Sequence, residues 1–311
     1  MEEAENELFN SYFIRHTDKL AISPKAILEL YSQDLIFIHF PGCDKHDPTA
    51  EDKESLNPDD YKGDAKSNMK IFTDLKTNGG FVWAKYNYNG TQKDKIGFVP
   101  KGSDISLIKH YQWENIKYPN RKNKVAIIKA IQMQDVKEIE PGKLMNLRVA
   151  QPRLRTLSHW KASKNKLYHI LHKKTLKIDF SNLSTPEQEV VCQEFLRHQK
   201  LFPNIPQLNY LLLPPGRTME DIDIFGLSTE NKKILAQVTY LEKSETKEFK
   251  NKVENLEKYS SLNDNFLLFF CRCPELHKDG NILFISISMV ENWLKQPGQE
   301  YYLKFLYSLS L

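Results

Sequence analysis

The sequence lacks several features that define common protein classes. No apolar run approaches the roughly 18–20 residues of a membrane helix, and the longest ones, FLLFF from Phe266 and YLLLPP from Tyr210, are short. Only four cysteines are present, too few and too irregularly placed for a disulfide framework. The first ten residues, MEEAENELFN, have neither the basic nor the apolar region of a secretory signal. We therefore expect an intracellular, cytoplasmic protein with reduced, buried thiols.

Sequence signatures of several enzyme classes are also missing. The chain contains no G-x-x-x-x-G-K-[ST] loop, no G-x-G-x-x-G fingerprint and no G-x-S-x-G elbow. No repeat of about 20–50 residues is found, which argues against solenoids and propellers. P-loop enzymes, dinucleotide-binding enzymes and α/β-hydrolases thus have no support in this sequence.

Charge is balanced over the whole chain but not along it. The 311 residues carry 44 basic and 40 acidic side chains, for a formal net charge of +4. Residues 46–64 hold seven acidic residues against two lysines and predict an exposed loop. Residues 143–178 hold ten Lys or Arg and no Asp or Glu. Such a block attracts phosphate backbones, although a solvated linker is the alternative interpretation.

The first part of the chain, residues 1–142, predicts a β-rich domain. Residues 33–40, 79–90 and 95–100 are rich in β-branched or aromatic side chains and are bounded by Gly, Pro or Asn. Asn89-Gly90 is a hairpin signal, because both residues accept a positive φ. Together these segments predict a small, barrel-like recognition domain, followed by a basic connecting segment over residues 143–183.

The last part, residues 184–311, predicts an α/β domain with a mixed central sheet. The order of expected elements is helix, strand, turn, strand, helix, strand, strand, helix, beginning at the capped helix start Ser184-Thr185-Pro186-Glu187. Apolar strands of this kind require helices on both faces. Among the expected strands, Asp221 and Asp223 share one face of one strand, and Gln237 and Thr239 share one face of the next.

These residues resemble a known family. A helix that carries Glu189, then Asp223-Ile224-Phe225-Gly226 on a hairpin strand, then Gln237-Val238-Thr239 on the following strand, resembles the PD-(D/E)XK nuclease superfamily and its Mrr-like restriction endonucleases. The resemblance covers roughly residues 184–295 and implies a restriction-endonuclease-like fold.

The resemblance also implies roles for single residues. Asp223 would be the central ligand of Mg²⁺ or Mn²⁺, Gln237 would offer its amide oxygen, and Glu189 would complete the metal site from the helix. The implied reaction is hydrolysis of a phosphodiester bond by metal-activated water.

One position departs from the family pattern. Thr239 stands where the family places a catalytic lysine, and a threonine cannot supply its positive charge. Lys243, Lys247 or Lys250 offers a substitute, and we favour Lys243 as the fourth catalytic residue.

The sequence therefore predicts a metal-dependent DNA endonuclease of restriction or genome defence that acts on double-stranded DNA, with a homodimer expected from the need to cut two strands. The expected backbone contacts lie in the basic segment: Arg153, Arg155, Lys161, Lys164 and Lys166. The alternative is a nucleic-acid-binding or assembly module whose nuclease-like domain has lost catalysis. A third interpretation makes the acidic loop and the barrel a protein-interaction platform.

Overall fold

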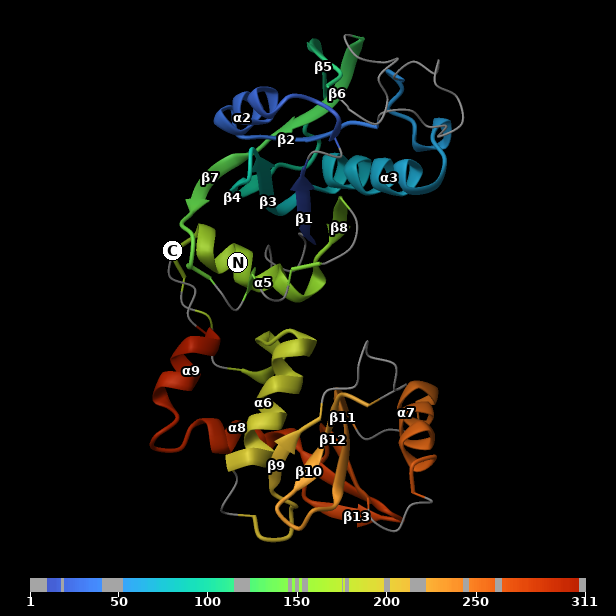
Figure 1. The fold of residues 1–311 in the computed structure, drawn as a ribbon, viewed down its shortest axis with the longest axis vertical. Helices are drawn as coiled ribbons and strands as arrows, with labels where there is room; N and C mark the ends of the chain where they lie inside the picture. The colour runs from blue at the N-terminus through green and yellow to red at the C-terminus, as the bar shows by residue number, and fades with distance from the viewer. Residues whose placement is uncertain are drawn as a thin grey trace. The chain divides into compact units, whose positions relative to one another are not determined.

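The computed structural model describes most of the chain in two compact units, an N-terminal one within Met1–Leu176 and a C-terminal one within Lys177–Ser308 (Figure 1). In the described part of the chain, no helix is both long and apolar enough to cross a membrane. The described residues are 10–17, 20–40, 53–114, 124–144, 147–148, 151–152, 156–174, 176, 179–198, 202–212, 222–242, 246–260 and 265–307.

The N-terminal unit is built on strands, as predicted. Its described strands are β1 (Asn10–His16), β2 (Leu35–Ile38), β3 (Gly80–Tyr88), β4 (Thr91–Val99), β5 (Ser106–Gln112), β6 (Val125–Gln132), β7 (Gln134–Ile139) and β8 (Leu157–His159). They form a five-stranded sheet in the order β7-β4-β3-β1-β8 and a three-stranded sheet in the order β2-β6-β5. The described strands thus make two sheets where we expected one small barrel, because the chain changes sheet at Met133, between β6 and β7.

The hairpin expected at Asn89-Gly90 is present in this unit. β3 and β4 form an antiparallel hairpin, and both turn residues, Asn89 and Gly90, have positive φ. Helix α2 begins after Ser23, whose hydroxyl accepts a hydrogen bond from the Ala26 N–H at 3.0 Å. The helical segments of the unit are α2 (Pro24–Ser32), η2 (Pro58–Asp60), α3 (Gly63–Asn78), η4 (Lys161–Ser163) and α5 (Lys164–Leu171).

The basic segment differs from the expected linker. Trp160, Leu167 and Ile170 are buried against Phe13 and Trp83 of the five-stranded sheet. These apolar side chains attach η4, α5 and β8 to the N-terminal unit. The two units therefore divide between Leu176 and Lys177, whereas we expected separate boundaries after residues 142 and 183.

The C-terminal unit has the mixed sheet and the two helical layers that the sequence predicts. Its sheet runs in the order β13-β14-β12-β11-β10-β9, with a parallel centre of β11, β12 and β14. Its elements are η5 (Phe180–Asn182), α6 (Thr185–His198), β9 (Leu208–Leu211), β10 (Ile224–Ser228), β11 (Lys233–Glu242), α7 (Lys247–Glu257), β12 (Asn265–Arg272), β13 (His277–Asp279), β14 (Ile282–Ser286), α8 (Ile287–Leu294) and α9 (Glu300–Tyr307).

Aromatic contacts fix the helices to the two faces of this sheet. On one face, Phe249 of α7 lies 5.2 Å from Phe269 of β12, measured between ring centroids. On the other face, Phe195 of α6 contacts both Phe270 of β12 and Trp293 of α8 edge-on. Cys192, Cys271 and Cys273 are buried, which confirms that part of the prediction for these three cysteines. The sheet is thus covered on both sides, and its strand ends are left to form sites.

A buried histidine makes the stability of the N-terminal unit depend on pH. The His16 ring is completely buried and stacks between Phe37 and Tyr86, and its Nε2 accepts the Phe37 N–H at 3.1 Å. Burial lowers the pKa of His16 from 6.5 to about 3, so the folded unit holds the neutral ring. The unfolded chain binds a proton below pH 6.5 that the folded unit does not bind.

We therefore expect the free energy of unfolding of this unit to fall by about 1.4 kcal/mol per pH unit as the pH drops from 6.5 toward 3. Urea unfolding of a Trp293→Phe protein, followed by the remaining tryptophans, measures it, since Trp83, Trp113 and Trp160 all lie in this unit. The His16→Gln variant is the control, because it lacks the titrating ring. An equal slope in both proteins contradicts the assignment to His16.

Candidate functional site

The hairpin of β10 and β11 places Asp223 beside Gln237. Asp223 directly precedes β10, and its N–H donates to the Ala236 carbonyl oxygen at 2.9 Å. The register pairs Ile224 with Ala236. Because the two strands are antiparallel, the next position along each brings Asp223 and Gln237 opposite one another. Two of the predicted site residues are therefore neighbours.

Two hydrogen bonds hold the Asp223 carboxylate in place. Its Oδ2 accepts the Gln237 Nε2–H at 2.6 Å and the Val238 backbone N–H at 2.7 Å. A carboxylate is a strong acceptor for both donors, because hydrogen bonds to an ionised group are shorter and stronger than neutral ones. The side chain is thereby oriented by backbone that belongs to the sheet and not to a loop.

The Gln237 amide has an unusual environment for a polar group. Its side chain is 3% exposed, and its Oε1 is buried without a hydrogen-bond partner in the described part of the protein. Leaving a buried polar atom unpaired costs about 1–3 kcal/mol, so such atoms call for an explanation. The amide oxygen of Gln237 and the carboxylate of its neighbour Asp223 are hard oxygen donors, the type that Mg²⁺ and Mn²⁺ prefer, and the amide nitrogen is the atom that contacts Asp223.

Glu189 approaches this pair from α6. It is partly exposed, and its negative charge and that of Asp223 both act on the buried thiol of Cys192. Burial is the largest cause that raises the pKa of Cys192, and the two carboxylates raise it further, so the thiol stays protonated. The shared effect on Cys192 puts Glu189 and Asp223 within electrostatic reach of one buried group.

The structure gives a mixed result for the remaining catalytic candidates. Thr239 is 8% exposed, and its hydroxyl accepts the Leu241 N–H at 3.3 Å, so it stays in the strand as a small polar residue. Lys247 and Lys250 lie on α7 and are exposed. Lys243 and Asp221 lie outside the described residues.

The oxygen donors at the hairpin are of the type that a divalent ion binds, but they are few. Asp223 supplies a carboxylate and Gln237 an amide whose nitrogen is the atom that contacts Asp223, and Glu189 adds charge. In the described ranges, no group of three or more His, Cys, Asp or Glu side chains has the geometry of a metal site. Mg²⁺ requires only one or two protein carboxylates, since water and substrate phosphate fill its other positions.

The expected phosphate contacts in the basic segment are only partly described. Lys161 is exposed in η4, where an anion can reach it. Lys166 is 1% exposed, contrary to the surface position that we expected, because it lies on the side of α5 that packs into the N-terminal unit. Arg153, Arg155 and the side chain of Lys164 lie outside the described residues.

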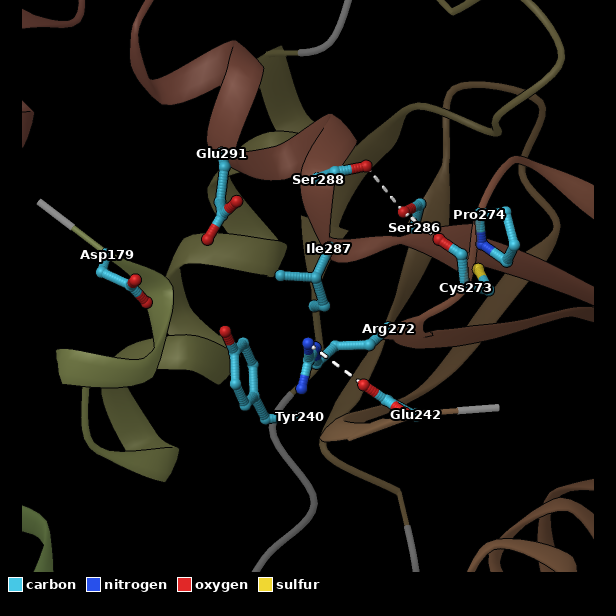
Figure 2. Close-up of a pocket in the computed structure, with 10 residues that line it drawn as sticks. All are labelled: Asp179, Tyr240, Glu242, Arg272, Cys273, Pro274, Ser286, Ile287, Ser288 and Glu291. Carbon is cyan, nitrogen blue, oxygen red and sulfur yellow. Dashed lines mark hydrogen bonds and ion pairs between the residues drawn. The ribbon is translucent and has the colours of Figure 1, made fainter. Parts of the chain in front are cut away.

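A cavity of about 550 Å³, which we did not expect from the sequence, opens at the carboxyl ends of β11, β12 and β14 (Figure 2). Arg272 extends over the Tyr240 ring, 5.2 Å from its centroid, and forms an ion pair with Glu242 at 3.1 Å. Figure 2 shows the Tyr240 hydroxyl directed toward the side lined by Asp179 and Glu291. The cavity could have been expected from the three parallel strands that end side by side, because α/β sheets form ligand sites at the carboxyl ends of such strands.

The charge of this cavity differs from that of a phosphate site. Asp179, Glu242 and Glu291 bring three carboxylates against the single guanidinium of Arg272. An excess of negative charge repels a phosphodiester. The cavity therefore does not belong to the contact surface that a nucleic acid would need.

Comparisons with known proteins found little. No family model matches the chain, and no curated protein matches it. A search of solved structures found similarity to a repair endonuclease from Pyrococcus abyssi, with 8% sequence identity and a TM-score of 0.22 over 85% of this chain and 96% of that one. A TM-score this low does not establish a shared fold.

The contact between Asp223 and Gln237 predicts an energetic coupling. Removing either side chain breaks the same charged hydrogen bond, so the losses in stability from Asp223→Ala and Gln237→Ala should not add. We expect the double variant to differ from the sum by about 1–2 kcal/mol. Hydrogen exchange of peptides from β10 and β11 measures the local opening free energy. Additive losses contradict a direct bond.

Proposed function

We propose that the C-terminal unit is a metal-dependent phosphodiesterase that cuts double-stranded DNA, in restriction or genome defence. The proposal rests on two neighbouring side chains with oxygen donors: the oriented Asp223 carboxylate, and Gln237, whose amide oxygen is buried without a partner among the described residues. The resemblance of these residues and Glu189 to the PD-(D/E)XK nucleases supports it. The homodimer remains a prediction.

In this proposal, Asp223 and Gln237 hold Mg²⁺ or Mn²⁺, and Glu189 adds a ligand or holds a water molecule. The ion supplies Lewis acidity, which lowers the pKa of attacking water and offsets charge on the phosphate. The Val238 N–H keeps Asp223 fixed, so the carboxylate is positioned before substrate arrives. The buried surroundings of Gln237 limit access of bulk water to its side of the site.

Thr239 favours a second candidate, a module that binds nucleic acid without cutting it. Its hydroxyl cannot replace an ammonium group, and the lysines of α7 named above are exposed to solvent. In this case the hairpin would keep its shape and metal affinity while the rate of cleavage fell. Cleavage and binding therefore have to be measured on the same protein preparation.

Cleavage of plasmid, phage and modified DNA, with single-stranded RNA alongside, tests the proposal in Mg²⁺ or Mn²⁺ against EDTA. We expect metal-dependent cutting by the wild type and a loss of at least 100-fold in Asp223→Ala, since a lost metal ligand removes several kcal/mol of transition-state stabilisation. Gln237→Ala should lose less, because a neutral oxygen donor is removed. DNA binding without cleavage, unchanged in Asp223→Ala, would instead establish the binding module.

Gln237→Glu tests the metal site without relying on activity. A second carboxylate opposite Asp223 repels it when no cation is bound, so the variant should be less stable than the wild type in EDTA. The added charge should strengthen cation binding. We expect 10 mM Mg²⁺ to raise the melting temperature of Gln237→Glu by several degrees more than that of the wild type.

The matched control is Gln207→Glu, since Gln207 hydrogen-bonds the Arg197 carbonyl oxygen at 2.9 Å, away from Asp223. Equal responses to Mg²⁺ in the two variants would contradict a cation at the hairpin.

A further inference from the structure

The five-stranded sheet of the N-terminal unit carries a row of charged side chains across three strands. Arg15 of β1 is paired with Lys85 of β3, and Lys85 is paired with Asp94 of β4. Paired residues of neighbouring strands project from the same face of a sheet. Phe13 and Trp83 lie two residues before Arg15 and Lys85 on the same strands, so they share this face of the sheet, where they are buried.

The carboxylate of this row has one oxygen, Oδ2, in an ion pair, and its Oδ1 is buried without a hydrogen-bond partner among the described residues. Asp94 is 2% exposed and forms an ion pair with Arg148, whose guanidinium also lies 5.7 Å from the centroid of the Trp83 ring. The Arg15 Nη2 donates to the Pro152 carbonyl oxygen at 2.8 Å, which holds its guanidinium at the end of the sheet. Among the described residues, the three cations Arg15, Lys85 and Arg148 thus lie near the one carboxylate of this row.

Lys85 is the cation of this row whose side chain has no direct partner among the described residues. Across the residues that the structure describes, its ammonium group makes no hydrogen bond and no ion pair. Burial lowers the pKa of Lys85, Asp94 opposes this effect, and the positive charges of Arg15 and Arg148 lower the pKa further. Asp94 is the one carboxylate near this partly buried ammonium and the two guanidinium groups, so a further anion would stabilise the cluster.

We propose that Lys85, with Arg15 and Arg148 beside it, binds a backbone phosphate of double-stranded DNA on the N-terminal unit. The ammonium of Lys85 contacts the phosphate oxygens, and the two guanidinium groups add positive potential from fixed positions. The choice of DNA as the source of the phosphate rests on the proposed function. The clustering of the three cations is independent of that function. Both Arg15 and Lys85 lie outside the basic segment, so composition alone does not reveal this site.

Binding of a fluorescent 20-base-pair duplex, measured by anisotropy in EDTA over a range of NaCl concentrations, tests the site. Each phosphate contact contributes about 0.9 to the slope of log affinity against log salt. We expect Lys85→Gln to lower the slope by about 0.9 and the affinity at 0.15 M salt roughly fivefold, which is that slope applied between 1 M and 0.15 M. Lys85→Arg keeps the charge and should bind like the wild type.

Lys25→Gln is the matched control, because Lys25 is an exposed lysine of α2 in the same unit, with 86% of its side chain accessible. It should leave the slope unchanged, and tryptophan fluorescence should show that all variants are folded. An unchanged slope in Lys85→Gln, or no salt-dependent DNA binding by the wild type, overturns the inference.

The outcome is separable from that of the proposed nuclease. EDTA removes the metal, so this assay measures DNA binding without cleavage. If Lys85→Gln weakens binding but no DNA is cut in Mg²⁺, the nuclease proposal fails and the phosphate site stands. If DNA is cut in Mg²⁺ but Lys85→Gln binds like the wild type, the nuclease proposal stands and the phosphate site fails.

Discussion

The antiparallel pairing of β10 with β11 is the constraint on which the candidate site depends. One backbone hydrogen bond, from Asp223 to Ala236, fixes where β10 begins, and the Val238 N–H returns a bond to the Asp223 side chain. The parallel strands β12 and β14 and the helices on both faces hold β11 in the middle of the sheet. A shift of one residue in this register would turn Gln237 away from Asp223, because neighbouring residues of a strand face opposite sides.

The sequence was informative where local chemistry decides the structure. The alternation along β11 predicted that Gln237 and Thr239 share one face. Apolar runs and their boundaries predicted four strands and three helices of the C-terminal unit, whereas its described residues form two further strands and the additional helix α9. The Asn89-Gly90 turn was predicted for the same reason, since it depends on residues close in sequence.

Features that depend on distant parts of the chain were not predictable in this way. The ten basic residues of 143–178 suggested a linker, yet Trp160 and Leu167 bury that region against β1 and β3. Composition records the charge of Lys166 but not the side of α5 on which it lies. The row of Arg15, Lys85 and Asp94 exists only because a parallel pairing joins β1 to β3, which lie about 70 residues apart.

The central claim is that Asp223 and Gln237 form a site for a hard divalent cation, and titration with Mn²⁺ followed by electron paramagnetic resonance tests it most directly. Free Mn²⁺ gives a strong signal that weakens when the ion binds to protein. The account predicts that the wild-type protein removes about one equivalent of free Mn²⁺ and that Asp223→Asn does not, with Mg²⁺ competing for the same site. Equal Mn²⁺ binding by both proteins, or none by the wild type, would contradict it.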